Sequence, residues 1–464
     1  MLLIFIAITL LAAYASVNYS GNIIVYLLFT LLANLLLYFG FSKNAIFFDA
    51  FIGMFFWLGF WLKLTLRVAF FDGFFHEAVG NFDKSGVAFD RSLLVASCGL
   101  SGLLLVSMIR RKLFFNYYNK IHNFPNKNLF NFYKRYRSAY ILLFVLLFLF
   151  IAISNVLLGI YQRGSITQTE LPFGFNGFYK WMLLFGLASF SALILNFEFK
   201  IHKKISLLVF FLTLLESFFS NVSMLSRGMI LNFSALFYGL IISSKINAIK
   251  LRLRFLLVSF SIFAALFISS VLLVNQLRLN FYLDSDSESN TQEINTQEIR
   301  AMTAPLFIDR WIGMEGVMAV SSYPNLGWDL WRKALKESYN EKEASFYDKN
   351  LIKSPYEKTD KTKHHFITLP GIVAFFFYPG SFWFLFVSMF AIGGFAAFIE
   401  FSVYKLGGEN LILCSLLAQV LAYRFSSFGY VPAQSYFLLG ALFLNLFIIY
   451  FAEKCIGFYK NTLG

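Results

Sequence analysis

The stretch "ILLFVLLFLFIAISNVLLGI", residues 141–160, runs for twenty residues without one charged side chain. A helix of about 20 residues is long enough to cross the roughly 30 Å hydrocarbon core of a bilayer. Inside that core every backbone hydrogen bond must be made within the chain, and a helix does so by itself. The spans of a β-barrel are instead short segments of alternating polarity. The stretch therefore predicts a membrane-spanning α-helix.

Similar apolar stretches recur along the whole chain. Its 464 residues are 58% hydrophobic and only 14% charged, which is too apolar for a soluble globular domain of this length. We predict an all-α polytopic membrane protein with about twelve transmembrane helices. The expected spans lie near residues 2–19, 22–41, 45–66, 92–109, 139–160, 177–196, 205–223, 229–244, 255–275, 381–403, 410–428 and 435–452.

The segment from Arg110 to Arg137 carries eight Lys/Arg residues between two of these spans. Short connections rich in Lys and Arg stay in the cytoplasm, so this segment predicts a cytoplasmic loop and places both chain termini in the cytoplasm. Most of the net charge of +14 then lies along the cytoplasmic rim, where it can meet anionic membrane lipids. This distribution explains the charge without a nucleic-acid partner.

The predicted spans divide the chain into three parts. Residues 1–275 hold the first nine helices, residues 276–368 form a long external loop, and residues 369–464 hold a re-entrant segment and the last three helices. The loop carries twelve Lys/Arg and fourteen Asp/Glu, so it is nearly neutral. Loops of this length are translocated largely regardless of their charge, so the loop is compatible with the orientation.

The long loop contains two expected helices. Thr303 is an N-cap candidate, and a helical apolar pattern follows it to about Val320. In the second helix, after Pro324, Trp328, Trp331 and Tyr339 share one face. This helix could lie on the membrane boundary, cover a cavity between the spans, or simply pack on the membrane domain.

A short apolar segment closes the loop. Residues Phe366 to Tyr378 are too few to cross a bilayer, and the dipeptides Pro370-Gly371 and Pro379-Gly380 interrupt the segment. We therefore expect a re-entrant or buried segment, because irregular backbone at membrane depth must be covered by protein or line a wet cavity.

Arg227 stands in "NVSMLSRGMIL", a short external turn between two spans, on the side where positive charge is disfavoured. A cation at this depth needs a partner or a function. One interpretation is headgroup snorkelling or an ion pair with Glu216. The other is a basic pocket for a phosphorylated ligand, since the guanidinium fork grips phosphate bidentately. The further candidates for that pocket are Arg163, Arg310, Arg424, Lys63 and Arg67.

A lipid-linked pyrophosphate suits such a pocket, because its polyprenyl tail lies in the bilayer and its diphosphate at the boundary. No Gly-rich phosphate loop after a strand is present, and the adjacent His364 and His365 lack carboxylate or cysteine neighbours at metal-ligand spacing. A histidine at the end of the loop could instead accept a proton from an attacking hydroxyl, or be merely solvated.

Two motifs carry a resemblance to a known family. Ser226-Arg227-Gly228 at the outer start of the eighth span, and "LPGIVAFFFYPGS" after the long loop, resemble segments of the bacterial O-antigen polymerases of the Wzy type. These enzymes are similar in outline to the O-antigen ligases and to C-type glycosyltransferases. The resemblance implies a bacterial inner-membrane protein that needs neither a cofactor nor a metal. Its implied partners are undecaprenyl-pyrophosphate-linked glycans, a chain-length regulator and a flippase.

The resemblance also implies roles for individual residues. The external arginines would neutralise the departing pyrophosphate. A base would take the acceptor proton, and aromatic side chains would stack on sugar rings. The candidates for the base are His364, His365, Asp309 and Glu315, and those for stacking are Trp328, Trp331 and Tyr339.

The resemblance implies that the protein polymerises lipid-linked glycan repeat units. Three other functions are alternatives to this one. A lipid-linked oligosaccharide flippase also has about twelve spans, although transport requires no long external loop, and no repeat relates the two halves of this chain. An O-antigen ligase performs the same chemistry on another acceptor. A structural or channel protein is the remaining alternative.

Overall fold

The computed structural model describes residues 2–75, 77–113, 117, 127–226, 228–249, 253–283, 310–352, 365 and 367–463, and within them the chain forms helices and connections but no β-strand. Each of the twelve segments predicted to span a membrane is helical. The helices in these segments are α1 (Leu2–Asn18), α2 (Ile23–Gly40), α3 (Phe47–Phe56) with η1 (Trp57–Leu62) and α4 (Lys63–Phe70), α5 (Gly86–Leu113), α7 (Arg137–Leu158), η3 (Pro172–Gly174) and α8 (Phe175–Trp181) with η4 (Met182–Gly186) and α9 (Leu187–His202), α10 (Leu207–Ser223), α11 (Met229–Ile246), α12 (Leu253–Leu283), α17 (Phe382–Leu406), α18 (Leu411–Ser426), and η7 (Pro432–Gln434) with α19 (Ser435–Leu463).

Nine helical segments in the described part of the chain are long and apolar enough to cross a membrane. Shorter apolar helices lie at residues 6–18, 207–223 and 411–426, within α1, α10 and α18. The all-helical, polytopic character of the chain is therefore confirmed. The count of twelve crossings stays a prediction.

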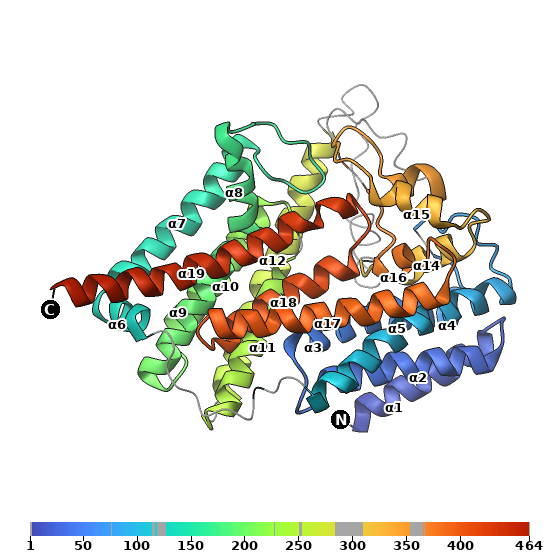
Figure 1. Cartoon of the computed structure of the whole chain (residues 1–464), viewed down its shortest axis with the longest axis horizontal. Coiled ribbons are helices and arrows are strands. Elements are labelled where there is room, and N and C mark those ends of the chain that lie inside the picture. Colours follow the sequence, from blue (N-terminus) through green and yellow to red (C-terminus); the bar gives the residue numbers. More distant parts are fainter. Residues whose placement is uncertain are drawn as a thin grey trace.

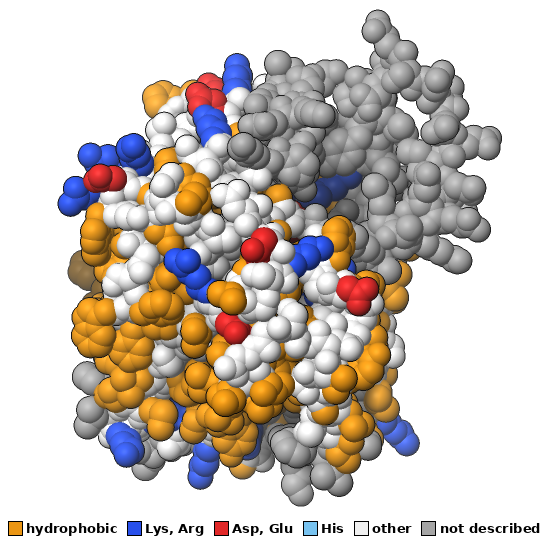
Figure 2. Space-filling model, turned by 90° about the vertical axis from the view of Figure 1, so that its right-hand side faces the viewer, with side chains coloured by type: hydrophobic (Ala, Val, Ile, Leu, Met, Phe, Trp, Pro, Cys, Tyr) orange, Lys and Arg blue, Asp and Glu red, His pale blue; other side chains and the backbone are white. Residues whose placement is uncertain are grey.

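The outward faces of several helices are apolar, as expected of surfaces that meet lipid. On α7, Phe144 and Phe148 are buried, whereas Leu143, Phe150 and Leu157 are exposed. One face of the molecule shows hydrophobic side chains gathered over its lower part, with Lys/Arg and Asp/Glu side chains scattered across its middle (Figure 2). Large exposed apolar surfaces of this kind mark regions that meet lipid or another protein.

Within the described residues, five shorter helical elements lie outside the predicted spans. Helices α14, α15 and α16 gather near one end of α5 and α17, whereas α6 lies beside the far end of α19 (Figure 1). The predicted cytoplasmic segment and the predicted external loop thus occupy different ends of the bundle. The five elements are α6 (Lys127–Arg135), α14 (Met314–Ser321), α15 (Trp328–Leu335), η5 (Asp348–Ile352) and α16 (Ile372–Phe376).

The described part of the long loop is built into the bundle. Helix α12 continues to Leu283, so the predicted boundary at residue 275 falls inside this helix. Helix α14 is buried over its whole length. Two glycines allow this burial, because a Cβ on Gly59 would lie 2.3 Å from the carbonyl oxygen of Ile312 and one on Gly316 would lie 1.8 Å from that of Pro370. The loop backbone therefore packs directly against η1 and against the segment before α16.

The elements expected within and after the loop are present. Helix α15 follows Pro324 as predicted, but it ends at Leu335, so Tyr339 lies outside it. Helix α14 begins at Met314, and residues 310–313 before it are not helical, so the helix predicted from Thr303 begins later than expected; residues 303–309 lie outside the described chain. The short helix α16 is buried and far too short to span a bilayer, as expected for the segment that ends at Tyr378. Gly371, with φ +80°, starts α16 in the left-handed conformation that glycine adopts at little cost.

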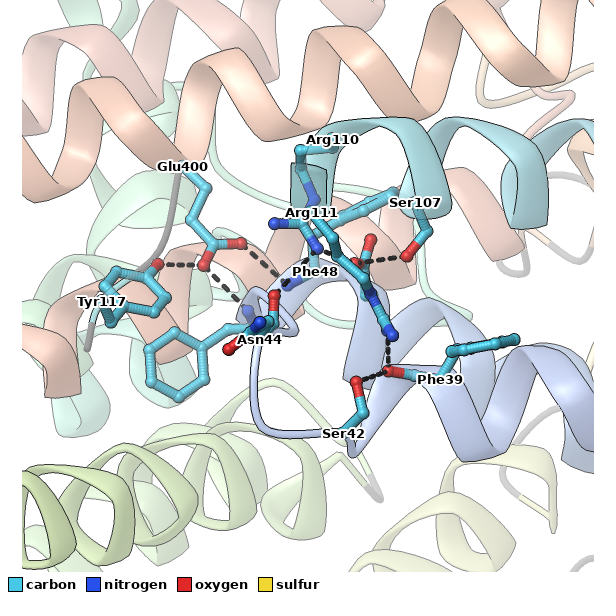
Figure 3. A network of polar contacts seen from close by, with 11 residues as sticks. Phe39, Ser42, Asn44, Phe48, Ser107, Arg110, Arg111, Tyr117 and Glu400 are labelled. Carbon is cyan, nitrogen blue, oxygen red and sulfur yellow. Dashed lines mark hydrogen bonds and ion pairs between the residues drawn. The ribbon is translucent and has the colours of Figure 1, made fainter. Parts of the chain in front are cut away.

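A buried polar network holds the opposite end of the bundle together (Figure 3). The Glu400 carboxylate of α17 accepts hydrogen bonds from the backbone N–H groups of Phe47 and Phe48, both at 2.8 Å, and from the Tyr117 hydroxyl. It thereby supplies the acceptor that the first turn of α3 otherwise lacks. Beside it, Arg110 of α5 donates to Asp49 of α3 at 2.5 Å.

We expect Glu400→Ala to lower the free energy of unfolding by about 2–4 kcal/mol, because two buried N–H groups would lose their acceptor. Glu400→Gln should lower it less, since the amide oxygen still accepts one bond. Thermal unfolding of the purified protein in detergent measures the effect, and the exposed Glu170→Ala serves as the control. Equal stability of Glu400→Ala and wild type would show that the cap contributes little.

Candidate functional site

The turn between α10 and α11 is tightly built. Leu225 adopts a left-handed conformation with φ +50°, and the Ser226 N–H donates to the carbonyl of Asn221 at 2.8 Å. The Gly228 N–H donates to the Ser226 hydroxyl at 3.1 Å. Arg227 itself lies outside the described residues. Ser226 and Gly228 of the Ser-Arg-Gly motif thus belong to a turn that is fixed by hydrogen bonds.

Three neighbouring segments hold this turn. The Asn155 amide of α7 donates to the carbonyl of Ser223 at 2.9 Å, and the Arg163 backbone N–H donates to that of Met224 at 2.9 Å. The Arg278 guanidinium, in the last turns of α12, donates to the carbonyl of Leu225 through Nε at 3.0 Å and Nη2 at 2.7 Å. Arg278 also reaches the Arg163 carbonyl at 3.5 Å. These contacts attach the turn to α7, to α12 and to the segment after α7.

Four arginines gather beside the turn, and we call Arg163, Arg278, Arg310 and Arg424 the arginine cluster. Burial, followed by the nearby charges of Arg163 and Arg278, lowers the pKa of Arg310. The Arg163 side chain interacts electrostatically with Tyr161 and Tyr423. Tyr161 also lies close to Arg424. The cluster therefore joins residues that are more than two hundred and fifty positions apart in the sequence.

Aromatic packing explains how Arg310 reaches the end of α18. The ring of Trp311 stacks on Phe55 with centroids 5.9 Å apart, and Phe55 packs edge-on against Tyr423 at 5.9 Å. Arg310 precedes Trp311 and Arg424 follows Tyr423, so this aromatic chain sets their relative position.

The described residues place no carboxylate beside three of the four arginines in this cluster. Across the described residues, no carboxylate lies within ion-pair distance of Arg163, Arg310 or Arg424. The Nε of Arg424 is buried and has no hydrogen-bond partner among those residues. Like charges held together in a partly buried place repel each other, and an unused buried donor costs about 1–3 kcal/mol. An anion with several oxygen atoms would relieve both costs.

Lys63 and Arg67 are placed differently from these arginines. The Lys63 ammonium, whose side chain is 1% exposed, forms a 2.6 Å ion pair with Glu315 of α14. Arg67 is buried and stacks over the ring of Phe71 at 4.8 Å. The structure thus joins a predicted phosphate-binding residue, Lys63, to a predicted base, Glu315, whereas Asp309 lies outside the described chain.

His365 lies beside the cluster. Its backbone N–H donates to the carbonyl of Gly164, the residue after Arg163, at 3.2 Å. Its Nδ1 lies 2.7 Å from the carbonyl oxygen of Glu341, which can only accept, so Nδ1 carries the proton. The other ring nitrogen, Nε2, is buried and finds no partner in the described part of the chain. The hydrogen bond of Nδ1 thus fixes the orientation of the imidazole; His364 lies outside the described residues.

The three aromatic candidates divide into two groups. Trp328 and Trp331 both pack edge-on against Phe384 of α17, with centroids 4.8 and 5.4 Å apart. Trp331 is partly buried, so its ring serves the packing of α15 on the bundle, which is one of the alternatives considered for this helix. Tyr339 is 45% exposed and packs near Tyr430 instead. A role of the two tryptophans in sugar stacking stays a prediction.

The sequence interpretation missed Arg278, because it placed this residue in the external loop. The apolar pattern of "LLVNQLRLNFYL", residues 272–283, continues the helix and could have signalled that α12 extends past residue 275. Tyr161 and Tyr423 were missed for another reason. Tyr161 follows α7 and Tyr423 lies in α18, and no charge or motif in the sequence marks either tyrosine as a neighbour of the Arg163 side chain.

The arrangement can bind an anion and hold a base next to it. Guanidinium groups present paired donors to phosphate oxygens, and an imidazole is a common proton acceptor in catalysis. Across the described chain no three His, Cys, Asp or Glu side chains gather as a metal site would require. Comparisons of the chain with protein families, with curated proteins and with solved structures found no match.

Proposed function

We propose that this protein polymerises undecaprenyl-pyrophosphate-linked oligosaccharide repeat units into O-antigen or a similar surface polysaccharide. The observation that carries the proposal is the arginine cluster, which has no carboxylate partner for Arg163, Arg310 or Arg424 among the described residues. A diphosphate bears enough oxygen atoms to engage several guanidinium groups at once. Its polyprenyl tail can stay in the bilayer between the apolar helices.

The arginines act on the donor. In the transfer, the bond between the anomeric carbon and the pyrophosphate oxygen breaks, and the electron pair leaves with the lipid pyrophosphate. Negative charge therefore grows on that oxygen in the transition state. Fixed positive charges at this place stabilise the transition state more than the ground state, which accelerates the reaction. The proposal includes Arg227, whose neighbours Ser226 and Gly228 lie in the turn held by Arg278.

His365 acts on the acceptor. The terminal hydroxyl of an incoming repeat unit forms the new bond to the anomeric carbon and gives its proton to Nε2 of His365. The Glu341 carbonyl holds Nδ1–H at 2.7 Å and so directs the free lone pair of Nε2 away from itself. The other proposed bases are His364, Asp309 and Glu315. Glu315 is the weakest of these, because its carboxylate is already engaged by Lys63.

The proposal also covers the surroundings of the enzyme. The protein would lie in the bacterial inner membrane with twelve spans, both termini in the cytoplasm and the arginine cluster on the periplasmic side. Its partners would be the lipid-linked glycans, membrane lipids, a chain-length regulator and the flippase that delivers the repeat units. The reaction requires no metal or cofactor in this scheme, since guanidinium groups supply the positive charge.

Complementation of a strain that lacks the protein tests this function. Arg227→Ala should yield only single-repeat surface glycan on a gel, because the donor pyrophosphate loses one guanidinium. Arg91→Gln, an exposed arginine at the start of α5, should restore the full ladder of chain lengths.

The pattern of failure separates the alternatives. A normal ladder from Arg227→Ala would contradict the proposed role of this residue. Accumulation of repeat units on the cytoplasmic side in the deletion strain would favour a flippase. Loss of even single-repeat glycan from lipid A would favour a ligase.

A further inference from the structure

Three aromatic rings from distant segments meet next to the arginine cluster. Tyr430, which follows α18, lies with its ring centroid 5.5 Å from that of His365 and 5.9 Å from that of Tyr339. Tyr339 is 45% exposed, and the other two rings are half-buried. We call these three rings the aromatic patch. Partly exposed rings that are not consumed by core packing remain available to a ligand.

A carboxylate borders the patch. Glu341 accepts hydrogen bonds from the Thr167 N–H at 3.1 Å, from the Thr167 hydroxyl at 3.2 Å and from the Tyr339 hydroxyl. Burial raises the pKa of Glu341, but the hydrogen bonds from Tyr339 and Thr167 outweigh it and leave the pKa below its ordinary value. The side chain therefore stays negatively charged, and its oxygen atoms favour ligand groups that donate hydrogen bonds.

The patch is held in place by backbone contacts. The Glu337 carboxylate accepts from the N–H groups of Phe346 at 2.6 Å and Val431 at 3.2 Å, which ties the residue after Tyr430 to the end of α15. The Tyr430 hydroxyl reaches the carbonyl of Asn340 at 3.4 Å. The rings of Tyr339 and Tyr430 are therefore attached to the same framework.

Tyr161 connects the patch to the arginine cluster. Its side chain interacts electrostatically with Arg163, with Arg424 and with Tyr339. His365, the third ring of the patch, binds the backbone of Gly164 next to Arg163. A ligand that lies across the patch therefore ends near the guanidinium groups.

We propose that the aromatic patch, with Glu341 at its edge, binds the terminal sugar of the acceptor and selects a neutral or amino sugar over an acidic one. The apolar face of a sugar ring packs on the tyrosines, while its hydroxyl or ammonium groups donate to Glu341. A uronic acid would place a second negative charge beside this carboxylate. This inference deepens the proposed function, because it assigns the acceptor side of the same site.

The arginine cluster and Glu341 carry opposite charges and would therefore favour different ligands at the two ends of the site. The arginine cluster attracts the anionic pyrophosphate, and Glu341 repels it, so a donor pyrophosphate is disfavoured at the acceptor side. Because the His365 ring belongs to the patch, a sugar on the patch lies beside this imidazole. Opposite charges at the two ends would thus distinguish donor from acceptor without any change of shape.

The test measures binding rather than turnover. Wild-type protein in nanodiscs is titrated with a panel of neutral and acidic tetrasaccharides, and separately with inorganic pyrophosphate. The neutral compounds should bind more tightly than the acidic ones. The double variant Tyr339→Ala/Tyr430→Ala should bind the neutral tetrasaccharides at least about fivefold more weakly, because two ring contacts are lost. Tyr436→Ala, which removes an exposed tyrosine of α19, should have no effect.

Three results would overturn the inference: unchanged sugar binding by the double variant, acidic sugars bound as tightly as neutral ones, or no binding of any tetrasaccharide. Glu341→Gln should reduce the difference in affinity between neutral and acidic sugars. An unchanged difference in affinity would show that Glu341 does not select the sugar. Pyrophosphate binding should survive all these substitutions. If the wild-type protein binds the tetrasaccharides but not pyrophosphate, the result contradicts the proposed polymerase function. The assignment of the aromatic patch as a sugar-binding site would then still hold.

Discussion

Replacing Arg424 by glutamine should slow glycan transfer by about 100- to 1,000-fold, the usual effect of removing one donor from a charge-stabilising site. The Nε of Arg424 is buried without a partner in the described chain, so its hydrogen-bonding capacity is unused before a ligand binds. The loss should appear mainly in kcat, because the charge on the leaving pyrophosphate grows in the transition state. Initial rates in proteoliposomes supplied with lipid-linked repeat units measure it.

Two control variants separate charge from folding. Arg424→Lys keeps the positive charge but not the bidentate geometry, and it should recover part of the rate. Arg91→Gln removes an exposed arginine and should leave the rate unchanged. A wild-type rate from Arg424→Gln would exclude the residue from the pyrophosphate site.

The effects of the other arginines should not simply add to this one. Arg163 and Arg310 lie close enough that the charge of one lowers the pKa of the other. Arg163→Gln should therefore relieve repulsion at Arg310 while it removes a ligand for the anion. We therefore expect the fold loss of rate in the double variant Arg163→Gln/Arg310→Gln to be smaller than the product of the fold losses in the two single variants.

Replacing His365 by alanine should slow transfer by about 100- to 10,000-fold, because the acceptor hydroxyl would lose its proton acceptor. The Glu341 carbonyl fixes the tautomer in which Nε2 has a free lone pair. Binding of pyrophosphate should be unaffected, since the arginine cluster remains. The same proteoliposome assay, together with a pyrophosphate titration, distinguishes loss of chemistry from loss of binding.

Other histidine substitutions provide the comparison. His202→Gln alters a histidine beside Glu198 at the opposite end of the bundle and should leave the rate unchanged. His364→Gln should reduce the rate far less than His365→Ala. A severe loss in His364→Gln with normal activity in His365→Ala would move the base to the neighbouring residue.

The helices were predictable from the sequence because the signal for them is local. The run at residues 141–160 predicts a helix by its length and polarity alone, and α7 spans Arg137–Leu158. The buried segment that ends at Tyr378 was predictable for the same reason, since Pro and Gly limit its length. Burial of α14 was not expected, because it depends on close backbone contacts at Gly59 and Gly316.

The candidate site was predictable only in part. Arg163, Arg310 and Arg424 were chosen because they are cations on the predicted external side, and the structure brings them together. The same criterion selected Lys63, but the structure pairs it with Glu315. A sequence shows that a cation is present and does not show which side chain neutralises it.

The sequence by itself therefore determined an all-helical membrane architecture, because apolar length and backbone hydrogen bonding leave a bilayer-spanning chain few alternatives. Only the tertiary structure decided that four arginines share one place, that the His365 imidazole has a fixed tautomer and that Tyr339 and Tyr430 form a patch beside them. These groups come from segments far apart in the chain. Their distances depend on how the helices pack, and packing is a property of the whole molecule.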